Sequence, residues 1–380
     1  MRVGIDAHIL GKGKGGVETV LLGIIRSLAQ LDFTNEYLIY VSRRHPFRAG
    51  ELPSNFRLCP LPVANPWIQR PLVIPFLYAR DRLDVIHLQR VMPFWGCQRC
   101  VLHIHDALYE THPQFFSPLK RRIFSAISRR SATRATRIVT VTEHARREIS
   151  AVFGVPAERI DVISNGLDSV SFHAAVGAES LDRILQRCAV TRPYVIVLGM
   201  LERHKNTDIA LRAFERFSAA HPAFTLLVVG RRRTETRRGY ADELQELAAS
   251  LCAAPKIKFQ GYVSDEDRLA LLNGASMLVF PATAEGFGLP PIEAMACGVP
   301  VIAADTPVAR EVYADAVMLS RPLDPADLAA QMDQLAADHQ IRTVLVARGL
   351  THAAKYSWRN VAYKLIKIYE QVSQCRSAAP

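Results

Sequence analysis

Short apolar runs alternate with longer amphipathic segments along almost the whole chain. The runs are rich in β-branched residues and predict buried strands, whereas the segments between them predict helices such as 208–219, 241–251 and 268–275. Strands that are separated by helix-length segments indicate crossover connections and parallel sheets. We expect strands at 2–5, 37–41, 84–88, 101–104, 138–141 and 161–163, and then at 194–198, 225–229, 257–260, 277–280, 301–304 and 317–319.

The strands fall into two series, separated by a polar and weakly patterned stretch. Two series in 380 residues predict an α/β protein with two doubly wound, Rossmann-like parallel-sheet domains that face each other across a cleft. The expected domains are 1–170 and 193–356, with 171–192 as the linker. Ligands of such folds bind beyond the carboxyl ends of the strands, so the loops after the strands are where chemistry is expected.

Composition narrows the class of protein. Hydrophobic residues make up 49% and charged residues 22% of the chain, which is typical of a globular protein and excludes wholesale disorder. The opening MRVGID is too short to read as a signal peptide, and no apolar run reaches the length of a membrane span. Seven scattered cysteines favour a reducing compartment, so we expect a cytoplasmic protein.

The formal net charge is +11, and much of the excess lies in one segment. This segment, 118–147, contains one acid, Glu143, and nine basic residues: Lys120, Arg121, Arg122, Arg129, Arg130, Arg134, Arg137, Arg146 and Arg147. Leu119, Ile123 and Ile127 form an apolar stripe between these charges, as in helices that lie on anionic membranes. Alternatively, the stripe faces the domain's own core. Two interpretations are also open for the aromatic segment 66–78 and for Phe94-Trp95. These residues would either line a binding site for a lipid or sugar acceptor or pack in the core.

The most informative segment begins directly after the strand that ends at Phe280. It reads EGFGLPPIEAMACGVP from Glu285 to Pro300. A glycine loop that leads into a helix N-terminus offers backbone N–H groups to an anion such as a diphosphate. Glu285 and Glu293, eight residues apart, are placed to accept hydrogen bonds from sugar hydroxyls on either side of it. For Glu293 alone, a carboxylate that complements the helix dipole is the simpler interpretation.

This segment resembles the E-x7-E signature of retaining glycosyltransferases of the GT4 class, which have the GT-B fold. Further matches are Gly15-Gly16-Val17-Glu18 with the family's glycine loop, His105-Asp106 with its HD motif, and Lys205-Asn206 with its RKN motif. Residues 139–143 and 163–168 fit motifs near the linker, and Ser357-Trp358 fits the start of a C-terminal helix, 357–375, that packs back on the first domain. The pattern is similar to bacterial mannosyltransferases that build polysaccharides.

The resemblance implies a role for each matching residue. Glu293 would hold the ribose hydroxyls, and Glu285 would contact the transferred sugar. Lys205 would neutralise the leaving diphosphate, and His105 would lie over the sugar near the reacting carbon. The remaining positions would bring backbone close to sugar and phosphate: Gly15, Gly16, Gly286, Phe287, Gly288 and Leu289.

One position departs from the family pattern, and three other motifs admit a second interpretation. His204 stands where the family usually has arginine, so we expect Arg203 to reach the diphosphate instead. Residues 11–16 match G-x-G-x-x-G literally, but they do not follow the strand directly, which disfavours a dinucleotide site. Asp265-Glu266-Asp267 resembles a metal motif but stands where a helix cap is expected, so we expect no essential metal. His103 and His105 alternate along a strand, and such a pair is usually structural.

Taken together, the sequence predicts a retaining hexosyltransferase with no cofactor besides its nucleotide-sugar co-substrate. GDP-mannose is the best candidate donor, and a lipid-linked saccharide at the cytoplasmic face of the membrane is the expected acceptor. The basic segment 118–147 would attach the protein peripherally to an anionic membrane. Alternatives are a UDP-sugar-dependent enzyme, an epimerase or a phosphorylase of the same fold. A nucleic-acid-binding protein is disfavoured, because no recognition motif accompanies the pI of about 9.5.

Overall fold

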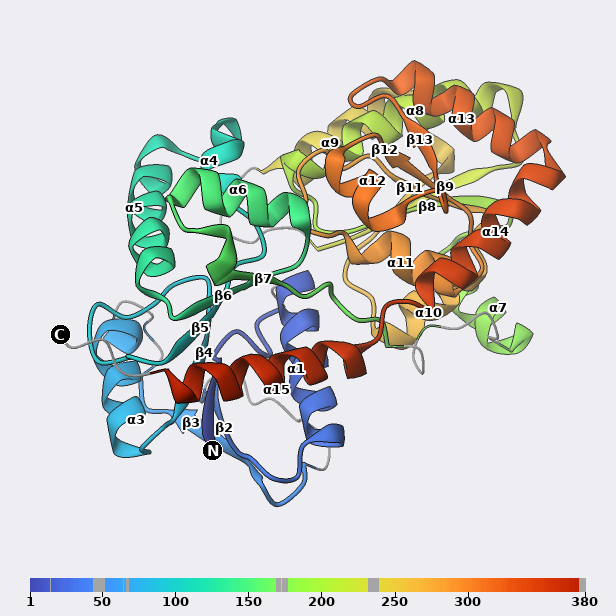
Figure 1. Ribbon diagram of the computed structural model, residues 1–380. Coiled ribbons are helices and arrows are strands. Elements are labelled where there is room, and N and C mark those ends of the chain that lie inside the picture. Colours follow the sequence, from blue (N-terminus) through green and yellow to red (C-terminus); the bar gives the residue numbers. More distant parts are fainter. Residues whose placement is uncertain are drawn as a thin grey trace. The chain divides into compact units, whose positions relative to one another are not determined.

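The computed structural model describes residues 1–13, 15–43, 52–63, 65, 68–168, 172, 177–231 and 239–375. Contacts within the chain divide it into two compact units. Unit 1 comprises Met1–Gly166 and Ser357–Pro380, and unit 2 comprises Leu167–Tyr356. The chain therefore passes from one unit to the other twice (Figure 1).

Unit 1 is built on a seven-stranded sheet whose described strand pairs are all parallel. The strands lie in the order β3-β2-β1-β4-β5-β6-β7. The sheet is buried because nearly every strand is an apolar run, which is expected when helices cover both faces. The strands are β1 (Arg2–Ala7), β2 (Glu36–Ser42), β3 (Phe56–Leu61), β4 (Val85–Gln89), β5 (Cys100–His103), β6 (Arg137–Thr140) and β7 (Ile160–Val162).

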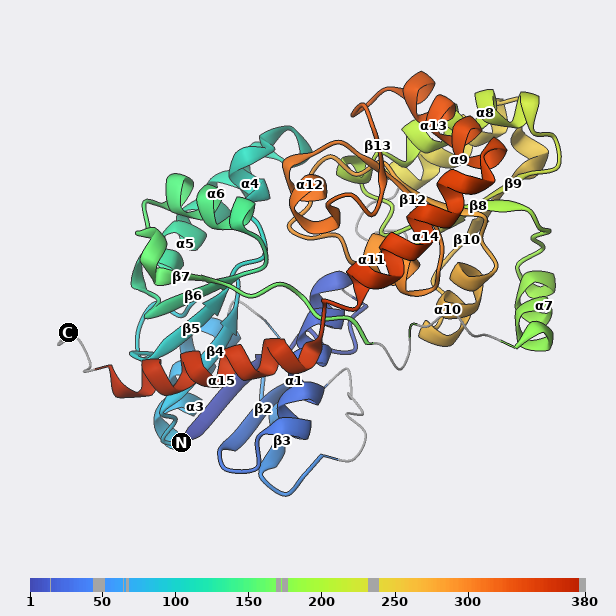
Figure 2. The same ribbon diagram turned by 45° about the vertical axis from the view of Figure 1, so that its right-hand side comes forward.

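A helix from the end of the chain completes unit 1. Helix α15 (Trp358–Gln374) lies against α1 (Gly16–Leu31) in both views (Figures 1 and 2). The two helices approach closely because Gly23 has no side chain, and a Cβ there would lie 2.3 Å from the ring of Trp358. The other helices of the unit are η1 (Gln69–Val73), α3 (Ile74–Arg80), α4 (Leu108–Thr111), η2 (Pro113–Phe115), α5 (Pro118–Arg134), α6 (Glu143–Phe153) and η3 (Ala157–Arg159).

Unit 2 is built on a six-stranded parallel sheet in the order β10-β9-β8-β11-β12-β13. Its strands are β8 (Tyr194–Leu198), β9 (Thr225–Val229), β10 (Ile257–Gln260), β11 (Met277–Phe280), β12 (Val301–Ala304) and β13 (Met318–Ser320). Its helices are α7 (Ala178–Arg187), η4 (Arg203–Lys205), α8 (Thr207–Ala220), α9 (Tyr240–Ser250), η5 (Ala254–Lys256), α10 (Asp265–Asn273), α11 (Leu289–Ala296), α12 (Pro307–Tyr313), α13 (Pro325–Ala337) and α14 (His339–Ala353).

Among the described elements, strand β3 and helix α7 differ from what the sequence pattern predicted. Strand β3 pairs with β2 at the edge of the first sheet, where its Pro60 and its exposed Arg57 are tolerated. Within the expected linker 171–192, residues 178–187 form helix α7, whose Leu181 and Ile184 are buried. The part of unit 2 that precedes β8 is therefore not simply a connection.

Each sheet reverses its strand order at one point, and this point is where ligands of such folds bind. In unit 1 the reversal lies between β1 and β4, and in unit 2 it lies between β8 and β11. The loops that leave the carboxyl ends of these four strands therefore frame the candidate sites.

Candidate active site

Lys205 and Glu285 meet at the point where the sheet of unit 2 reverses its strand order. Lys205 ends η4, which follows β8, and Glu285 lies in the loop after β11. The ammonium group of Lys205 contacts Oε1 of Glu285, and the two side chains are 20% and 18% exposed. Asn206 ties the two loops together, because its Nδ2 donates to the carbonyl of Pro281 at 3.0 Å and to Oγ1 of Thr283 at 2.9 Å.

Glu293 lies on α11 and is only 2% exposed. Its Oε1 lies 3.4 Å from Nη2 of Arg268 on α10, whereas its Oε2 is buried and has no hydrogen-bond partner among the described residues. Burial raises the pKa of Glu293, although the charge of Arg268 lowers it. A buried carboxylate oxygen without a partner is costly unless a ligand satisfies it, so Glu293 has an acceptor available for a hydroxyl group.

The loop Gly286–Leu289 leads into the N-terminus of α11. Gly288 has φ 79°, and a Cβ at this position would lie 2.0 Å from Oη of Tyr313. That hydroxyl lies 3.0 Å from the carbonyl oxygen of Phe287 and 3.1 Å from that of Gly288, so it fixes the loop from the carbonyl side. Within the described part of the chain, no side chain caps α11. Pro290 and Pro291 have no N–H, so the backbone donors without carbonyl partners within the helix are the N–H groups of Gly288 and Leu289, at the positive end of the helix dipole, which suits an anion.

In unit 1, the glycine loop after β1 leads into α1. Gly15 is the N-cap residue of this helix, with φ 64°, and a Cβ at Gly16 would meet no atom of the described residues within 4 Å. Oε1 of Glu18 accepts a hydrogen bond from the N–H of Gly11 at 2.5 Å and so closes the loop on the helix. Among the described residues, nothing fills the space beside Gly16 that a Cβ would occupy. Lys14 lies outside the described residues.

His105 follows β5 and is only 9% exposed. Its ring stacks on that of His103 at 4.2 Å between centroids, which confirms that the two histidines share one face. His103 in turn lies 5.6 Å from His87, whose Nδ1 is 2.6 Å from Oη of Tyr369 on α15. Burial lowers the pKa of His105 to about 4, as does the charge of Arg90, although Asp106 raises it. His105 is therefore a neutral imidazole at pH 7.

Comparison with known proteins decides the family. The family model described as "Glycosyl transferases group 1" matches residues 182–351, and that described as "Glycosyltransferase Family 4" matches residues 14–170. O-antigen chain mannosyltransferase B of Escherichia coli is 31% identical over 275 residues, which are 72% of this chain and 70% of that protein. The chain belongs to the family 4, group 1 glycosyltransferases. It is a hexosyltransferase of a retaining family.

Two further proteins are similar to this glycosyltransferase, one in sequence and one in fold. The serotype-specific mannosyltransferase WbdA of Escherichia coli is 26% identical over 63% of this chain, but the match spans only 29% of WbdA. The crystal structure of HepE from Anabaena, solved with UDP and glucose, has a TM-score of 0.75 at 20% identity and covers 98% of this chain and 100% of HepE. The fold is therefore GT-B, as the sequence predicted.

In this glycosyltransferase, Arg203 forms an ion pair with Glu243. Nη2 of Arg203 lies 2.5 Å from Oε1 of Glu243, and its guanidinium lies 5.4 Å from the ring centroid of Tyr240. His204, the other candidate for the missing motif arginine, lies 3.6 Å from Glu202. For Arg203 to reach a diphosphate, its ion pair with Glu243 would have to open.

Arg268 is a candidate site residue that sequence reasoning missed. It is 25 residues from Glu293 in the chain, and it follows an acidic run that drew attention to a metal motif instead. Ser264 caps that helix, because its Oγ accepts from the N–H of Asp267 at 3.1 Å, so the predicted capping role is confirmed. Only the packing of α10 beside α11 brings Arg268 to Glu293.

The apolar stripe of α5 does not face the core throughout its length. Leu119 is 70% exposed and Ile123 is 39% exposed, whereas Ile127 is half-buried. The alternative that this stripe packs into the unit's own core is therefore wrong for its first two positions. Phe76, Phe94 and Trp95 are also exposed, although Leu77 is buried; Pro66 and Trp67 lie outside the described residues. Among the described residues, no helix is both long and apolar enough to cross a membrane.

Proposed function

We propose that this glycosyltransferase transfers mannose from GDP-mannose, with retention, to a lipid-linked saccharide in polysaccharide biosynthesis. The observation that carries the donor site is the contact of Lys205 with Glu285 beyond the carboxyl ends of β8 and β11. A cation for a diphosphate and a carboxylate for sugar hydroxyls are the two groups that a nucleotide sugar requires. The proposed sugar rests on the similarity to two mannosyltransferases of Escherichia coli.

The proposed donor pose follows from the residues around this pair. The ribose hydroxyls would bind Oε2 of Glu293, which has no partner among the described residues. The diphosphate would lie at the N-terminus of α11 with Lys205, joined by Arg203 once its pair with Glu243 opens. Glu285 and the backbone of Gly286–Leu289 would hold the sugar, and Gly15, Gly16 and His105 would contribute from unit 1 after the domains close around the donor.

The proposed reaction needs no metal and no covalent intermediate. The bond between the sugar's C1 and the diphosphate oxygen breaks, and the acceptor hydroxyl oxygen bonds to C1 on the same face. The hydroxyl proton passes to the leaving diphosphate, which thereby serves as the base. Lys205 and the helix N-terminus stabilise the negative charge that develops there. His105 is neutral and therefore contributes hydrogen bonding rather than charge.

The acceptor would be presented at a membrane surface. The exposed Leu119 and Ile123 and the neighbouring Arg121 and Arg122 lie on α5, so an anionic bilayer can attract the charges and take up the apolar side chains. We place the enzyme peripherally on the cytoplasmic face of the membrane. Nucleic acid is not a proposed partner.

Thermal unfolding in the presence of nucleotides tests the donor. We expect GDP and GDP-mannose to raise the Tm, because a ligand that binds only the folded state stabilises it by mass action. UDP and ADP with their sugar forms serve as matched controls. Stabilisation by UDP and UDP-glucose alone would assign a UDP-sugar donor, the alternative that the UDP complex of HepE favours. If no nucleotide raises the Tm, the proposed donor site is wrong.

Two substitutions test the catalytic pair. Lys205→Ala and Glu285→Ala should each lower turnover by about tenfold or more, because each removes a group that acts on the diphosphate or the sugar. Lys355→Ala and Glu266→Ala change exposed side chains of the same unit and should leave turnover unchanged. All four variants should show wild-type circular dichroism. Wild-type turnover in Lys205→Ala or Glu285→Ala would refute the assignment.

A further inference from the structure

Large apolar side chains are exposed on three segments of unit 1: the helical segment η1–α3, the loop 90–99 after β4, and α5. Seven side chains there are between 39% and 70% exposed, and we call them the apolar band. They are Ile68, Leu72, Phe76, Phe94, Trp95, Leu119 and Ile123. Single apolar residues on a protein surface are ordinary, whereas a continuous exposed patch marks an interaction site.

The first part of the band is a stripe along η1–α3. Ile68, Leu72 and Phe76 recur every four residues, so they lie on one face of this helical segment. Ile74 and Leu77 on its other face are buried in the core of unit 1. The stripe therefore points away from the core, and no described side chain covers it enough to bury it.

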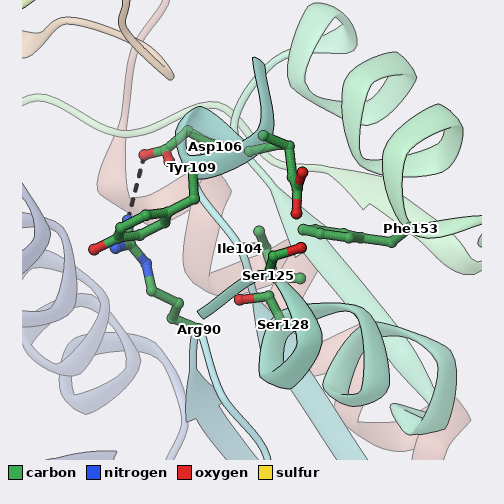
Figure 3. A pocket seen from close by; sticks show the side chains of 9 residues that line it. Arg90, Ile104, Asp106, Tyr109, Ser125, Ser128 and Phe153 are labelled. Atoms are coloured by element: carbon green, nitrogen blue, oxygen red, sulfur yellow. Dashed lines mark ion pairs between the residues drawn. The ribbon is translucent and has the colours of Figure 1, made fainter. Parts of the chain in front are cut away.

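The second part of the band lies on α5. Leu119 and Ile123 share a face of this helix with Arg130, which follows Leu119 by three helical turns. The opposite face points inward, because Ser128 is buried and lines a small pocket together with Ser125 (Figure 3). The exposed stripe of α5 is therefore the outer face of a helix whose inner face already packs within unit 1.

The loop after β4 joins the two helices into one surface. On one side, the guanidinium carbon of Arg130 on α5 lies 4.5 Å from the ring centroid of Phe94. On the other side, a Cβ at Gly96 would lie 2.7 Å from Cβ of Pro75 on α3. Trp95 stands between these two contacts in the chain. Since α3 and α5 also pack on the same apolar cluster of the sheet, the three parts of the band are continuous.

The charge of the three segments identifies what fits the band. Residues 68–80, 90–99 and 117–134 contain ten Lys or Arg and no Asp or Glu. A second copy of the chain on this surface would bring like charges together. An anionic bilayer instead offers phosphates to cations such as the exposed Arg121 and Arg122, and lipid to the apolar side chains. Aromatic residues flanked by arginine are typical of the boundary between lipid and water.

We propose that the apolar band is the surface of unit 1 that inserts into an anionic bilayer, with Phe94 and Trp95 at the level of the lipid headgroups. The membrane contact then extends from α5 across the loop after β4 to η1–α3. This inference rests on the membrane attachment proposed above and adds two segments to it. Two helices and a loop in contact with one surface also fix the orientation of unit 1 on the membrane, which α5 alone does not.

Two double variants test the added segments: Phe94→Ser with Trp95→Ser, and Leu72→Ser with Phe76→Ser. All four side chains are exposed, so both variants should fold and show wild-type circular dichroism. Phe33→Ser with Tyr363→Ser is the matched control, because these residues of unit 1 are 68% and 58% exposed and lie outside the band. Binding to vesicles of phosphatidylglycerol and phosphatidylethanolamine is measured by cosedimentation of the full chain.

We expect each band variant to bind the vesicles at least tenfold more weakly than the wild type, and the control to bind equally well. Wild-type binding by both band variants would overturn the inference, and so would a wild type that binds no vesicles. If only Leu119→Ser with Ile123→Ser loses binding, the attachment through α5 stands and the extended band is wrong. Thermal shifts with nucleotides on the same variants report on the donor site alone.

Tryptophan fluorescence tests insertion directly. Lipids brominated on their acyl chains quench a tryptophan that enters the bilayer. The difference in fluorescence between the wild type and Trp95→Phe isolates the contribution of Trp95. We expect this contribution to be quenched by brominated vesicles of the same lipid composition. A Trp95 contribution that brominated lipid leaves unchanged would overturn the insertion of the loop after β4.

Discussion

At the residue scale, Glu293 is a buried carboxyl group of unit 2 that has a cationic neighbour, Arg268, at one of its two oxygens. A buried carboxylate without a counter-charge is costly, and here the guanidinium approaches only one of its two oxygens. Glu293 is therefore buried with a counter-charge at one oxygen and with no hydrogen-bond partner at the other among the described residues. This arrangement is expected of a group that awaits a ligand hydroxyl, and it differs from the simpler sequence interpretation, in which Glu293 only complements the dipole of its helix.

Arg268→Met should destabilise the protein by about 2 to 3 kcal/mol at pH 7, at or below the low end for breaking a buried pair, because Arg268 is partly exposed. Burial already raises the pKa of Glu293, and loss of the guanidinium raises it further. Stability that depends on protonated Glu293 is present at low pH and is lost as the pH rises above about 4.5, the pKa in the unfolded chain. Urea unfolding at pH 5 and pH 8 measures the difference between variant and wild type.

The difference should be larger at pH 8 than at pH 5. The double variant Arg268→Met with Glu293→Gln is the control, because it removes the buried charge as well as its partner. Its stability relative to the wild type should be nearly independent of pH in this range. If the single variant loses the same stability at both pH values, Arg268 contributes through packing rather than through its charge. The packing partner would be Phe172, whose ring centroid lies 4.9 Å from the guanidinium carbon of Arg268.

At the element scale, the hydrophobic pattern predicted strands better than it predicted what surrounds them. Strands β8 to β12 begin and end where the apolar runs do, because buried parallel strands leave little else to determine their bounds. The pattern did not predict edge strand β3, because an edge strand tolerates Pro60 and so does not form a clear apolar run. It did not predict helix α7, because this helix lies in a polar stretch. The motifs predicted the loops that hold Lys205 and Glu285. They did not predict Arg268, which only tertiary packing brings to Glu293.

Helix α5 carries a prediction about membranes. Leu119→Ser with Ile123→Ser should weaken binding to vesicles of phosphatidylglycerol and phosphatidylethanolamine by about tenfold or more, because two exposed apolar side chains lose their contact with lipid. Val344→Ser with Leu350→Ser is a matched control, since these residues are 42% and 40% exposed on α14. Cosedimentation at low and high salt measures both the apolar and the electrostatic contribution. Unchanged binding of the α5 variant would argue that the membrane does not contact this helix.

At the scale of the whole molecule, the stability of unit 1 depends on pH because three buried histidines have lowered pKa values. Burial lowers the pKa of His87 and His105 to about 4 from 6.5, and it lowers that of His103 as well. Between pH 6.5 and 4, the unfolded chain therefore binds protons that the folded chain does not. The free energy of unfolding is highest above pH 6.5 and falls as the pH falls toward 4. Each imidazole contributes about 1.4 kcal/mol to this fall for every pH unit between its unfolded and folded pKa.

His103→Phe should reduce this acid sensitivity. Neither ring nitrogen of His103 has a hydrogen-bond partner among the described residues, so an apolar ring loses no hydrogen bond seen there and needs no proton. We expect the variant to gain thermal stability relative to the wild type at pH 5 and to gain less at pH 8, as measured by calorimetry. His339→Phe, at an exposed position on α14, should change neither value. If His103→Phe gains the same thermal stability at both pH values, its effect comes from packing. In that case protonation of His103 does not contribute to unfolding in acid.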